Sequence, residues 1–238
     1  MKSVLIGAPI CEWYEYCYPE FRRFLQSLTY PKKKTFLLDN SKGMRFYQRV
    51  LADGFMVQKT DHLWKIRDMV TRDHNILRQK VLDGHYDYLL ILDQDVIPPT
   101  DVIERLMAHD KDVVSALYFG HHDIGNGEIQ VMPFAWVFSK DLGDWDHTGY
   151  LLDDEVWEKQ QLVKIAFAGM GCLLIKRQVL EKVLFRYSSE MDAWDDRWFG
   201  VDVWANGFEF YLDNTVKCQH LYLKRPFDYH ALKEQGRN

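Results

Sequence analysis

Two aspartates, Asp93 and Asp95, stand one residue apart, directly after the apolar run 88–92 and shortly before Pro98-Pro99. Carboxylates at the tip of a buried strand can both reach a hard divalent cation, and a cation held in this way keeps open positions for phosphate oxygens. Acidic residues also simply mark the ends of many strands. The position after a strongly hydrophobic run favours the metal and phosphate interpretation.

Apolar runs alternate with amphipathic segments in the first half of the chain, and they predict the elements that place these aspartates. The expected strands cover residues 3–10, 35–38, 55–57 and 88–92, and the expected helices cover residues 19–28, 62–82 and 100–109. Such alternation predicts a Rossmann-like, doubly wound α/β fold, with a mostly parallel central sheet and helices on both faces. Ligands gather at the carboxyl ends of such strands, where Asp39 and the Asp93/Asp95 pair stand.

The second half is less regular. Strands are expected over residues 113–119, 129–138 and 163–175, helices around 179–183 and 198–205, and a mobile loop over 141–161. Gly169 and Gly171 interrupt the strand 163–175, either because backbone must approach a ligand there or because the strand bulges. Trp194 and Trp198 offer aromatic faces for a sugar, although most tryptophans in a chain of this size belong to the core.

Composition excludes several classes of protein. The chain has 238 residues and a formal net charge of -5, which disfavours a non-specific nucleic-acid binder. Its longest apolar runs are far short of the roughly 20 residues that span a bilayer, and the N-terminus lacks a signal-peptide layout. The four cysteines are scattered, so reduced thiols in a cytoplasmic protein are expected, with a Cys11–Cys17 disulfide left open.

Several fragments, in this order, resemble the GT-A fold glycosyltransferases, in particular the family 2-like enzymes that carry a DxD motif. The resemblance covers most of the chain, and its fragments are Val4–Pro9, Phe36–Ser41, Asp87–Pro98, Ala168–Lys176, Asp195–Phe208 and Tyr211–His220. It implies a single GT-A domain over residues 1–223, with a nucleotide-binding half (1–110), an acceptor-binding half (111–223) and a C-terminal tail (224–238).

The resemblance also implies that a nucleotide-sugar donor lies across the strand tips with Mn²⁺ or Mg²⁺. Asp95 then binds the metal directly, while Asp93 faces the ribose or reaches the metal through water, and Gln94 lies with them on the donor side. Asp39 matches the residue that contacts the base, or it only forms a turn. Ala8 and Pro9 match the backbone edge beside the nucleotide. A diphosphate that leaves as an anion needs such a cation.

In the same resemblance, Asp196 matches the general base that takes the proton of the acceptor hydroxyl in an inverting transfer, with Asp195 as second choice. Both carboxylates would also suit the first turn of a helix. His220 matches a late histidine that completes the metal shell, although a lone histidine is more often structural.

His74-Asn75 stands where many relatives have Arg-Asn. Asn75 therefore counts among the donor-binding residues, while a direct cationic contact to the diphosphate depends on His74, Arg72 or Arg78. A solvated helix face is the alternative for this segment.

The expected function is a metal-dependent transfer of a sugar from a nucleotide diphosphate to the hydroxyl of an unidentified acceptor, with inversion at the sugar carbon. Retention stays open, because both outcomes share this fold and the DxD motif. One alternative is a nucleotide- or carbohydrate-binding protein that has lost turnover. A nucleotidyltransferase is disfavoured, because the segment 8–16 is acidic and aromatic instead of glycine-rich and basic.

Overall fold

The computed structural model describes residues 1–123, 129–138, 145, 148–151, 159, 162–188 and 193–224. Its helices are α1 (Tyr18–Ser27), α2 (Arg45–Ala52), α3 (Ile66–Asp83), α4 (Val102–Ala108), α6 (Arg177–Lys182) and α7 (Asp195–Ala205), with short 3-10 turns at Glu12–Tyr14 and Leu221–Lys224. None of these helices has the length and the apolar character that a membrane crossing requires.

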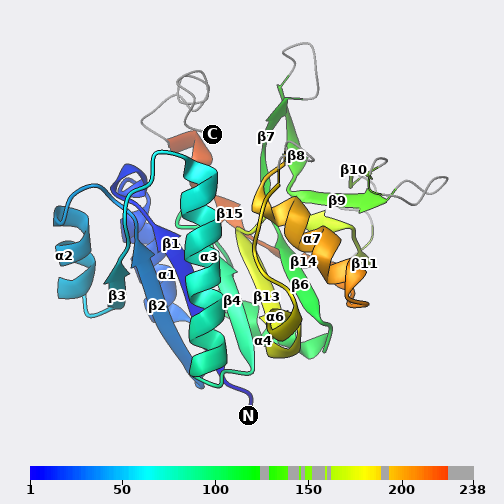
Figure 1. The fold of residues 1–238 in the computed structure, drawn as a ribbon, viewed down its shortest axis with the longest axis horizontal. Helices are drawn as coiled ribbons and strands as arrows, with labels where there is room; N and C mark the ends of the chain where they lie inside the picture. The colour runs from blue at the N-terminus through cyan, green and yellow to red at the C-terminus, as the bar shows by residue number, and fades with distance from the viewer. Residues whose placement is uncertain are drawn as a thin grey trace.

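In the described part of the chain, the strands form one large sheet and three small ones (Figure 1). Those of the large sheet are β1 (Val4–Ile10), β2 (Lys33–Asp39), β3 (Met56–Lys59), β4 (Tyr88–Leu92), β6 (Val113–Leu117), β11 (Leu162–Lys164), β13 (Cys172–Lys176) and β14 (Phe210–Lys217). The small sheets contain β5 (Val96–Ile97), β7 (Phe119–Asp123), β8 (Ile129–Pro133), β9 (Ala135–Phe138), β10 (Thr148–Tyr150), β12 (Phe167–Ala168) and β15 (Gln219–His220).

The large sheet has the order β11-β14-β6-β13-β4-β1-β2-β3. Strands β1 to β4 are parallel, as predicted, and β6 and β14 are parallel to each other. Strand β13 runs antiparallel between β4 and β6, so it begins at the edge of the sheet where β4 ends. This reversal brings Gly169 and Gly171, just before β13, close to the Asp93/Asp95 pair.

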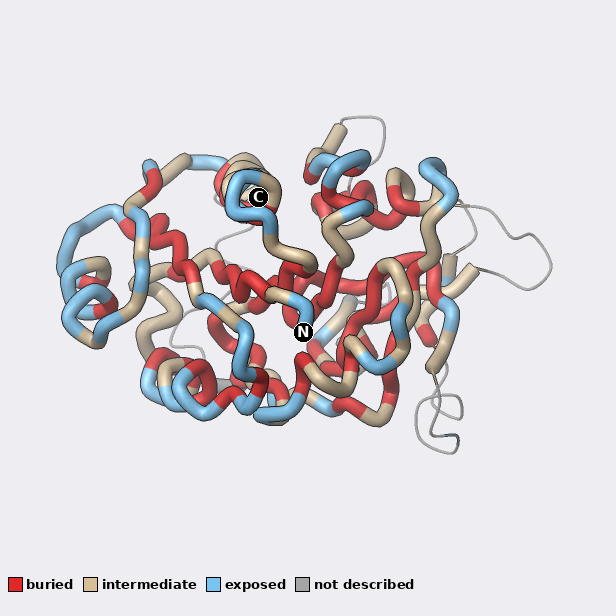
Figure 2. Tube along the Cα trace, turned by 90° about the horizontal axis from the view of Figure 1, so that it is seen from below, coloured by how far each residue is buried: buried red, intermediate tan, exposed pale blue. Residues whose placement is uncertain are grey.

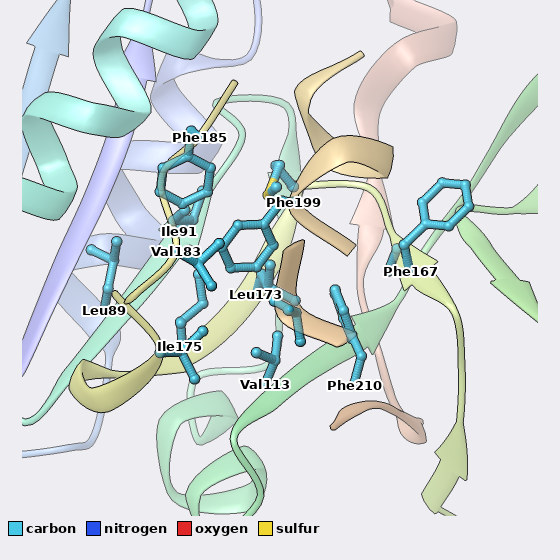
Figure 3. Close-up of a cluster of buried hydrophobic side chains, with 14 of the residues drawn as sticks. Leu89, Ile91, Val113, Phe167, Leu173, Ile175, Val183, Phe185, Phe199 and Phe210 are labelled. Atoms are coloured by element: carbon cyan, nitrogen blue, oxygen red, sulfur yellow. The ribbon is translucent and has the colours of Figure 1, made fainter. Parts of the chain in front are cut away.

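Alternate side chains of each central strand serve two different cores. On one face, Leu89 and Ile91 of β4 belong to a cluster with residues of α3, α6 and α7 (Figure 3). On the other face, Leu90 and Leu92 pack with residues of α1, α2 and α4. Each side chain in these runs is therefore buried whichever way it points, as expected for a sheet covered on both faces. Figure 2 shows the buried segments in the middle of the molecule and the exposed ones on the outside of the helices.

Several predicted boundaries were wrong. Helix α2 was not predicted, because only the turn-forming residues 39–43 were recognised between two strands. The expected strand 129–138 is two strands separated at Phe134, whose amide donates to the carbonyl of Tyr118 at 3.0 Å. Most of the loop expected over 141–161, and the tail from residue 225 onward, lie outside the described residues.

Candidate functional site

A cleft with a volume of about 430 Å³ opens at the edge of the sheet where β1, β2 and β4 end. The residues of the sequence prediction that line it are Pro9, His74, Asp93, Gln94, Asp95, Gly169, Trp194, Asp195, Asp196 and His220. Carboxyl ends of parallel strands meet at one edge, and this is the reason why residues so far apart in sequence come together.

Gln94 fixes the loop after β1 beside the two aspartates. Its side chain is buried, with Oε1 accepting from the amide of Cys11 at 2.9 Å and Nε2 donating to the carbonyl of Tyr14 at 3.0 Å. Cys17 and Cys11 are both free thiols, and Cys17 donates to the carbonyl of Tyr14 at 2.9 Å, so the disulfide left open by the sequence is absent. The hydrogen bonds of Gln94 therefore serve the protein's own loop.

Asp95 and His220 face each other in the cleft. Their nearest atoms, Oδ2 of Asp95 and Nε2 of His220, are 3.4 Å apart, and both side chains are buried. Nδ1 of His220 lies 2.7 Å from the carbonyl oxygen of Phe119, which can only accept, so Nδ1 carries a hydrogen. A neutral His220 then turns the lone pair of Nε2 toward a carboxylate, which requires a proton or a metal ion between the two.

The donor set therefore fits Mn²⁺ or Mg²⁺ as a partial shell of one carboxylate and one imidazole. In the described part of the chain, no three histidine, cysteine, aspartate or glutamate side chains gather closely enough to hold a metal by themselves. Asp93 does not complete a group of three with this pair, and its backbone amide donates to the carbonyl of Gly171 at 3.1 Å. The remaining ligands would have to come from a substrate or from water.

Asp195 and Asp196 begin helix α7 but lie in different environments. Asp195 is buried, and its Oδ2 lies 2.7 Å from Nδ1 of His74. Oδ1 of Asp196 accepts from the amide of Arg197 at 2.6 Å. Burial raises the pKa of Asp196 to about 7, and the charges of Asp195 and Asp93 add to this effect. Asp196 can therefore exchange a proton near neutral pH, while Asp195 is committed to an ion pair.

Three further polar residues of helix α3 that the sequence singled out, Asn75, Arg78 and Arg72, do not line the cleft. Asn75 does not line it, because its amide binds both backbone groups of Phe185, donating to the oxygen at 2.7 Å and accepting from the nitrogen at 3.2 Å. Arg78 donates to the carbonyl of Val183 at 3.0 Å, and Arg72 pairs with Asp73. The structure thus gives Asn75 a role in holding the chain around Phe185, in place of the predicted donor contact.

Asp39 is fully buried and does not line the cleft. Its carboxylate pairs with Nζ of Lys59 at 3.0 Å and accepts from the hydroxyl and the amide of Ser41. The next residue, Asn40, does line the cleft, and its Nδ2 donates to Asp73 at 2.9 Å. A carboxylate only accepts, so this bond fixes the amide and leaves Oδ1 of Asn40 as a buried acceptor with no partner among the described residues. Its position directly after a strand could have pointed to Asn40.

The two glycines make room for a tyrosine. A Cβ atom on Gly169 would lie 2.2 Å from the hydroxyl of Tyr118, and one on Gly171 would lie 2.6 Å from the ring of Tyr118. The amide of Gly171 donates to that hydroxyl at 3.0 Å. The sequence argument that a side chain here would occupy needed space was therefore sound, but Tyr118 fills the space. Gly171 and the buried Ala8 do not line the cleft.

The two tryptophans differ. Trp194 lines the cleft, and the guanidinium of Arg67 lies 5.2 Å from the centre of its ring. Trp198 is buried on α7 beneath Arg186, at 4.2 Å, and does not line the cleft, so the core interpretation applies to it.

Sequence reasoning also missed several aromatic and histidine residues of the cleft, which come from loops and from β7 without any motif. They are Trp13, Tyr14, His62, Trp64, His121, His122 and Phe134. His122 packs 4.4 Å from Phe134 between ring centres, and burial lowers its pKa to about 4, helped by His220 and His121. His122 is therefore neutral at physiological pH.

Comparison with known proteins identifies the fold. No protein-family model matches the chain, and no curated protein matches its sequence. Among solved structures, GalNAc-T7 with UDP, GalNAc and Mn²⁺ superposes with a TM-score of 0.63 at 13% identity, over 92% of this chain and 44% of that chain. S. aureus TarS 1–349 with UDP-GlcNAc gives a TM-score of 0.54 at 13% identity, over 88% and 55%.

The chain thus spans about half the length of these solved structures. Because the identity is low, the similarity concerns the fold, and it agrees with the mixed sheet and with the position of the cleft at the strand tips. The chain has the GT-A fold that its sequence fragments indicated.

Proposed function

We propose that the protein transfers a sugar from a nucleotide-diphosphate sugar to the hydroxyl of an acceptor, with inversion at the sugar carbon. The observation that carries this proposal is Asp196, a cleft carboxylate whose burial raises its pKa to about 7. A general base works best when its pKa lies near the pH of the reaction. Asp195 lacks this freedom because His74 holds it.

The donor is proposed to lie along the strand tips, with its diphosphate near β4 and its base near β2. Strand β1 separates β4 from β2, and neighbouring strands lie about 4.8 Å apart, so the two tips are about 10 Å from each other. This span suits a nucleoside between base and phosphate. Asn40, with its unpartnered Oδ1, is the proposed contact to the base, and it replaces Asp39 in that role.

Asp95 and His220 are the proposed residues that hold Mn²⁺ or Mg²⁺, with Asp93 near the ribose. When bound, such an ion supplies a Lewis acid that stabilises charge on a diphosphate. Asp196 accepts the proton of the attacking hydroxyl, and the ring of Trp194 offers a face to an acceptor sugar at the same end of the cleft.

The solved structures support the choice of donor to test first. GalNAc-T7 was crystallised with UDP, GalNAc and Mn²⁺, and TarS with UDP-GlcNAc. A UDP-sugar is accordingly the proposed donor. The cytoplasmic location and the single domain over residues 1–223, with its two halves, belong to the same proposal.

The first test is a thermal-shift screen of UDP-GlcNAc, UDP-GalNAc, GDP-mannose and dTDP-glucose, each with and without Mn²⁺, followed by measurement of UDP release. A ligand at about 100 times its dissociation constant adds roughly 2.7 kcal/mol to stability, which such a screen detects easily. We expect a UDP-sugar to stabilise the protein only with the metal, and UDP release to stop in chelator.

Asp95→Asn tests the metal residues, with Asp110→Asn as control, because Asp110 is an 85% exposed aspartate outside the cleft. The first variant should lose the metal-dependent shift and the second should keep it. Binding of a UDP-sugar without any turnover would support the binding-protein alternative, and no binding of any nucleotide sugar would contradict the proposal.

A further inference from the structure

A buried ion pair joins helices α3 and α7 in the wall of the cleft, where both of its residues are lining residues. Nδ1 of His74 lies 2.7 Å from Oδ2 of Asp195, and the two side chains are 1% and 4% exposed. The partners are 121 residues apart in sequence. A buried charge pair of this kind is costly to desolvate, so it needs a reason beyond stability.

Other charged groups around the pair come from two places. Asp73 precedes His74 on α3 and is itself bound by Arg72 and Asn40, while Asp93 follows β4. Burial alone would lower the pKa of His74, but Asp195 first, and then Asp93 and Asp73, bring it above its ordinary value. The surroundings therefore favour the charged imidazolium. On its other side, the ring of Phe185 lies 5.2 Å from that of His74.

The carboxylate next to this pair is Asp196. It faces the charges of Asp195, Asp93 and His74, and the amide of Arg197 donates to it. Two adjacent carboxylates without a cation would share a proton, because like charges at short range cannot both ionise easily. His74 reduces this conflict, since its positive charge offsets part of the effect of Asp195 and Asp93 on Asp196.

We propose that His74 is a positioning residue for Asp196, because its ion pair with Asp195 fixes the first turn of α7 and offsets part of the charge of Asp195 beside Asp196. The contribution to turnover rests on the proposed function, whereas the effect on Asp196 is a property of the free protein. His74 also lines the cleft, and its Nε2 has no hydrogen-bond partner among the described residues, so a contact to the donor is the competing role that the test must separate.

The test is an NMR titration of aspartate carboxyl carbons in the free protein, with the Asp196 signal assigned by its absence in Asp196→Asn. His74→Gln removes the cation and should move the Asp196 midpoint upward, by about half a pH unit or more. Asp195→Asn, which has nearly the same shape, removes the larger anionic effect and should move that midpoint downward. A purely structural role would not produce opposite shifts.

His109→Gln is the matched control, because it breaks a second histidine–aspartate pair, with Asp213, at 2.8 Å and outside the cleft. It should leave the Asp196 midpoint unchanged. If His74→Gln does not fold, His74→Asn is the second variant, and the same upward shift of the Asp196 midpoint is expected of it.

An unchanged Asp196 midpoint in the His74 and Asp195 variants would overturn the proposal, and weaker UDP-sugar binding by His74→Gln would then assign His74 to the donor. No substrate is present in the titration, so a failure of the proposed function would be seen separately, as absence of turnover in the wild-type protein. In an active enzyme, the acid limb of the pH profile should move in the same direction as the midpoint.

Discussion

Asp39 and Asp196 lie near the same edge of the sheet, yet their surroundings are opposite. Asp39, at the end of β2, is fully buried and has a lysine and a serine as partners. Asp196, in the first turn of α7, has a backbone amide as its hydrogen-bond donor and two further carboxylates nearby. A carboxylate that is paired with a cation and a hydroxyl, like Asp39, holds its loop in place. A carboxylate with one hydrogen-bond donor and further negative charges nearby, like Asp196, can exchange a proton. The comparison therefore separates residues that shape the cleft from a residue that can do chemistry in it.

The largest expected effect is on Asp196. Asp196→Asn should reduce sugar transfer by at least about 100-fold, since this is the usual contribution of a general base, while UDP-sugar binding stays nearly unchanged. The measurement is steady-state turnover together with calorimetric titration of the donor. Near-normal turnover of this variant would show that Asp196 is not the general base. The contrast between a structural Asp39 and a reactive Asp196 would then be wrong.

The second prediction concerns pH. Because the pKa of Asp196 is raised to about 7, the base is protonated below that pH, and turnover should fall about tenfold for each pH unit of further acidification. The profile of kcat/KM against pH reports this group in the free enzyme. A flat profile between pH 5 and pH 7 would show that no group of this kind controls the rate.

For Asp39, whose charge is paired with Lys59, we expect the effect on the stability of the folded protein. Lys59→Met leaves Asp39 as a buried charge without its lysine, and we expect a loss of about 2 kcal/mol in the free energy of unfolding, below the effect of breaking a fully buried pair because Lys59 is 23% exposed. Urea unfolding measures the loss. Lys164→Met is the matched control, since its pair with Glu209 is exposed on both sides, and it should change stability much less. Equal losses in the two variants would contradict the assignment of Asp39 to structure.

The smallest expected effect is on stability and concerns Asp213, a paired carboxylate on β14 in the other half of the sheet. Burial tends to raise the pKa of Asp213, but hydrogen bonds from His109 and Thr215 bring it below its ordinary value. A lowered pKa means that the stabilisation is present above about pH 4, the unfolded value, and is lost as the pH falls through the folded value. Asp213→Asn should therefore cost about 1 kcal/mol at pH 7 and much less below pH 3, measured by unfolding at both pH values.

The elements of the first half were predictable because each leaves a local pattern. The runs around β1, β2 and β4 are continuous and apolar since both faces are covered, and the aspartates after β4 mark the strand tip. The antiparallel direction of β13 was not predictable, because an apolar run carries no sign of its direction. Helix α2 was missed since it is short and lies between turn residues.

The candidate site was predictable where a residue type alone suggests chemistry, as for Asp95 and Asp196, whose chemical roles remain predictions. The site was not predictable where the role of a residue depends on the side chain or backbone group that it contacts in the folded protein. Asp39 looks reactive until Lys59 is seen beside it, and Asn75 looks available until Phe185 is seen to occupy its amide. These partners stand 20 and 110 residues away in the sequence, so only tertiary structure reveals them.

Strand β4 pairs on one side with β1 and on the other with β13, which follows about 80 residues later in the chain. During synthesis, the first 110 residues therefore emerge with the most hydrophobic strand at an open edge. Such an edge is a template for pairing with another chain. We expect a fragment ending at residue 110 to aggregate, and the intact chain to require prompt arrival of β13, so the reversed strand also protects the protein from self-association while it folds.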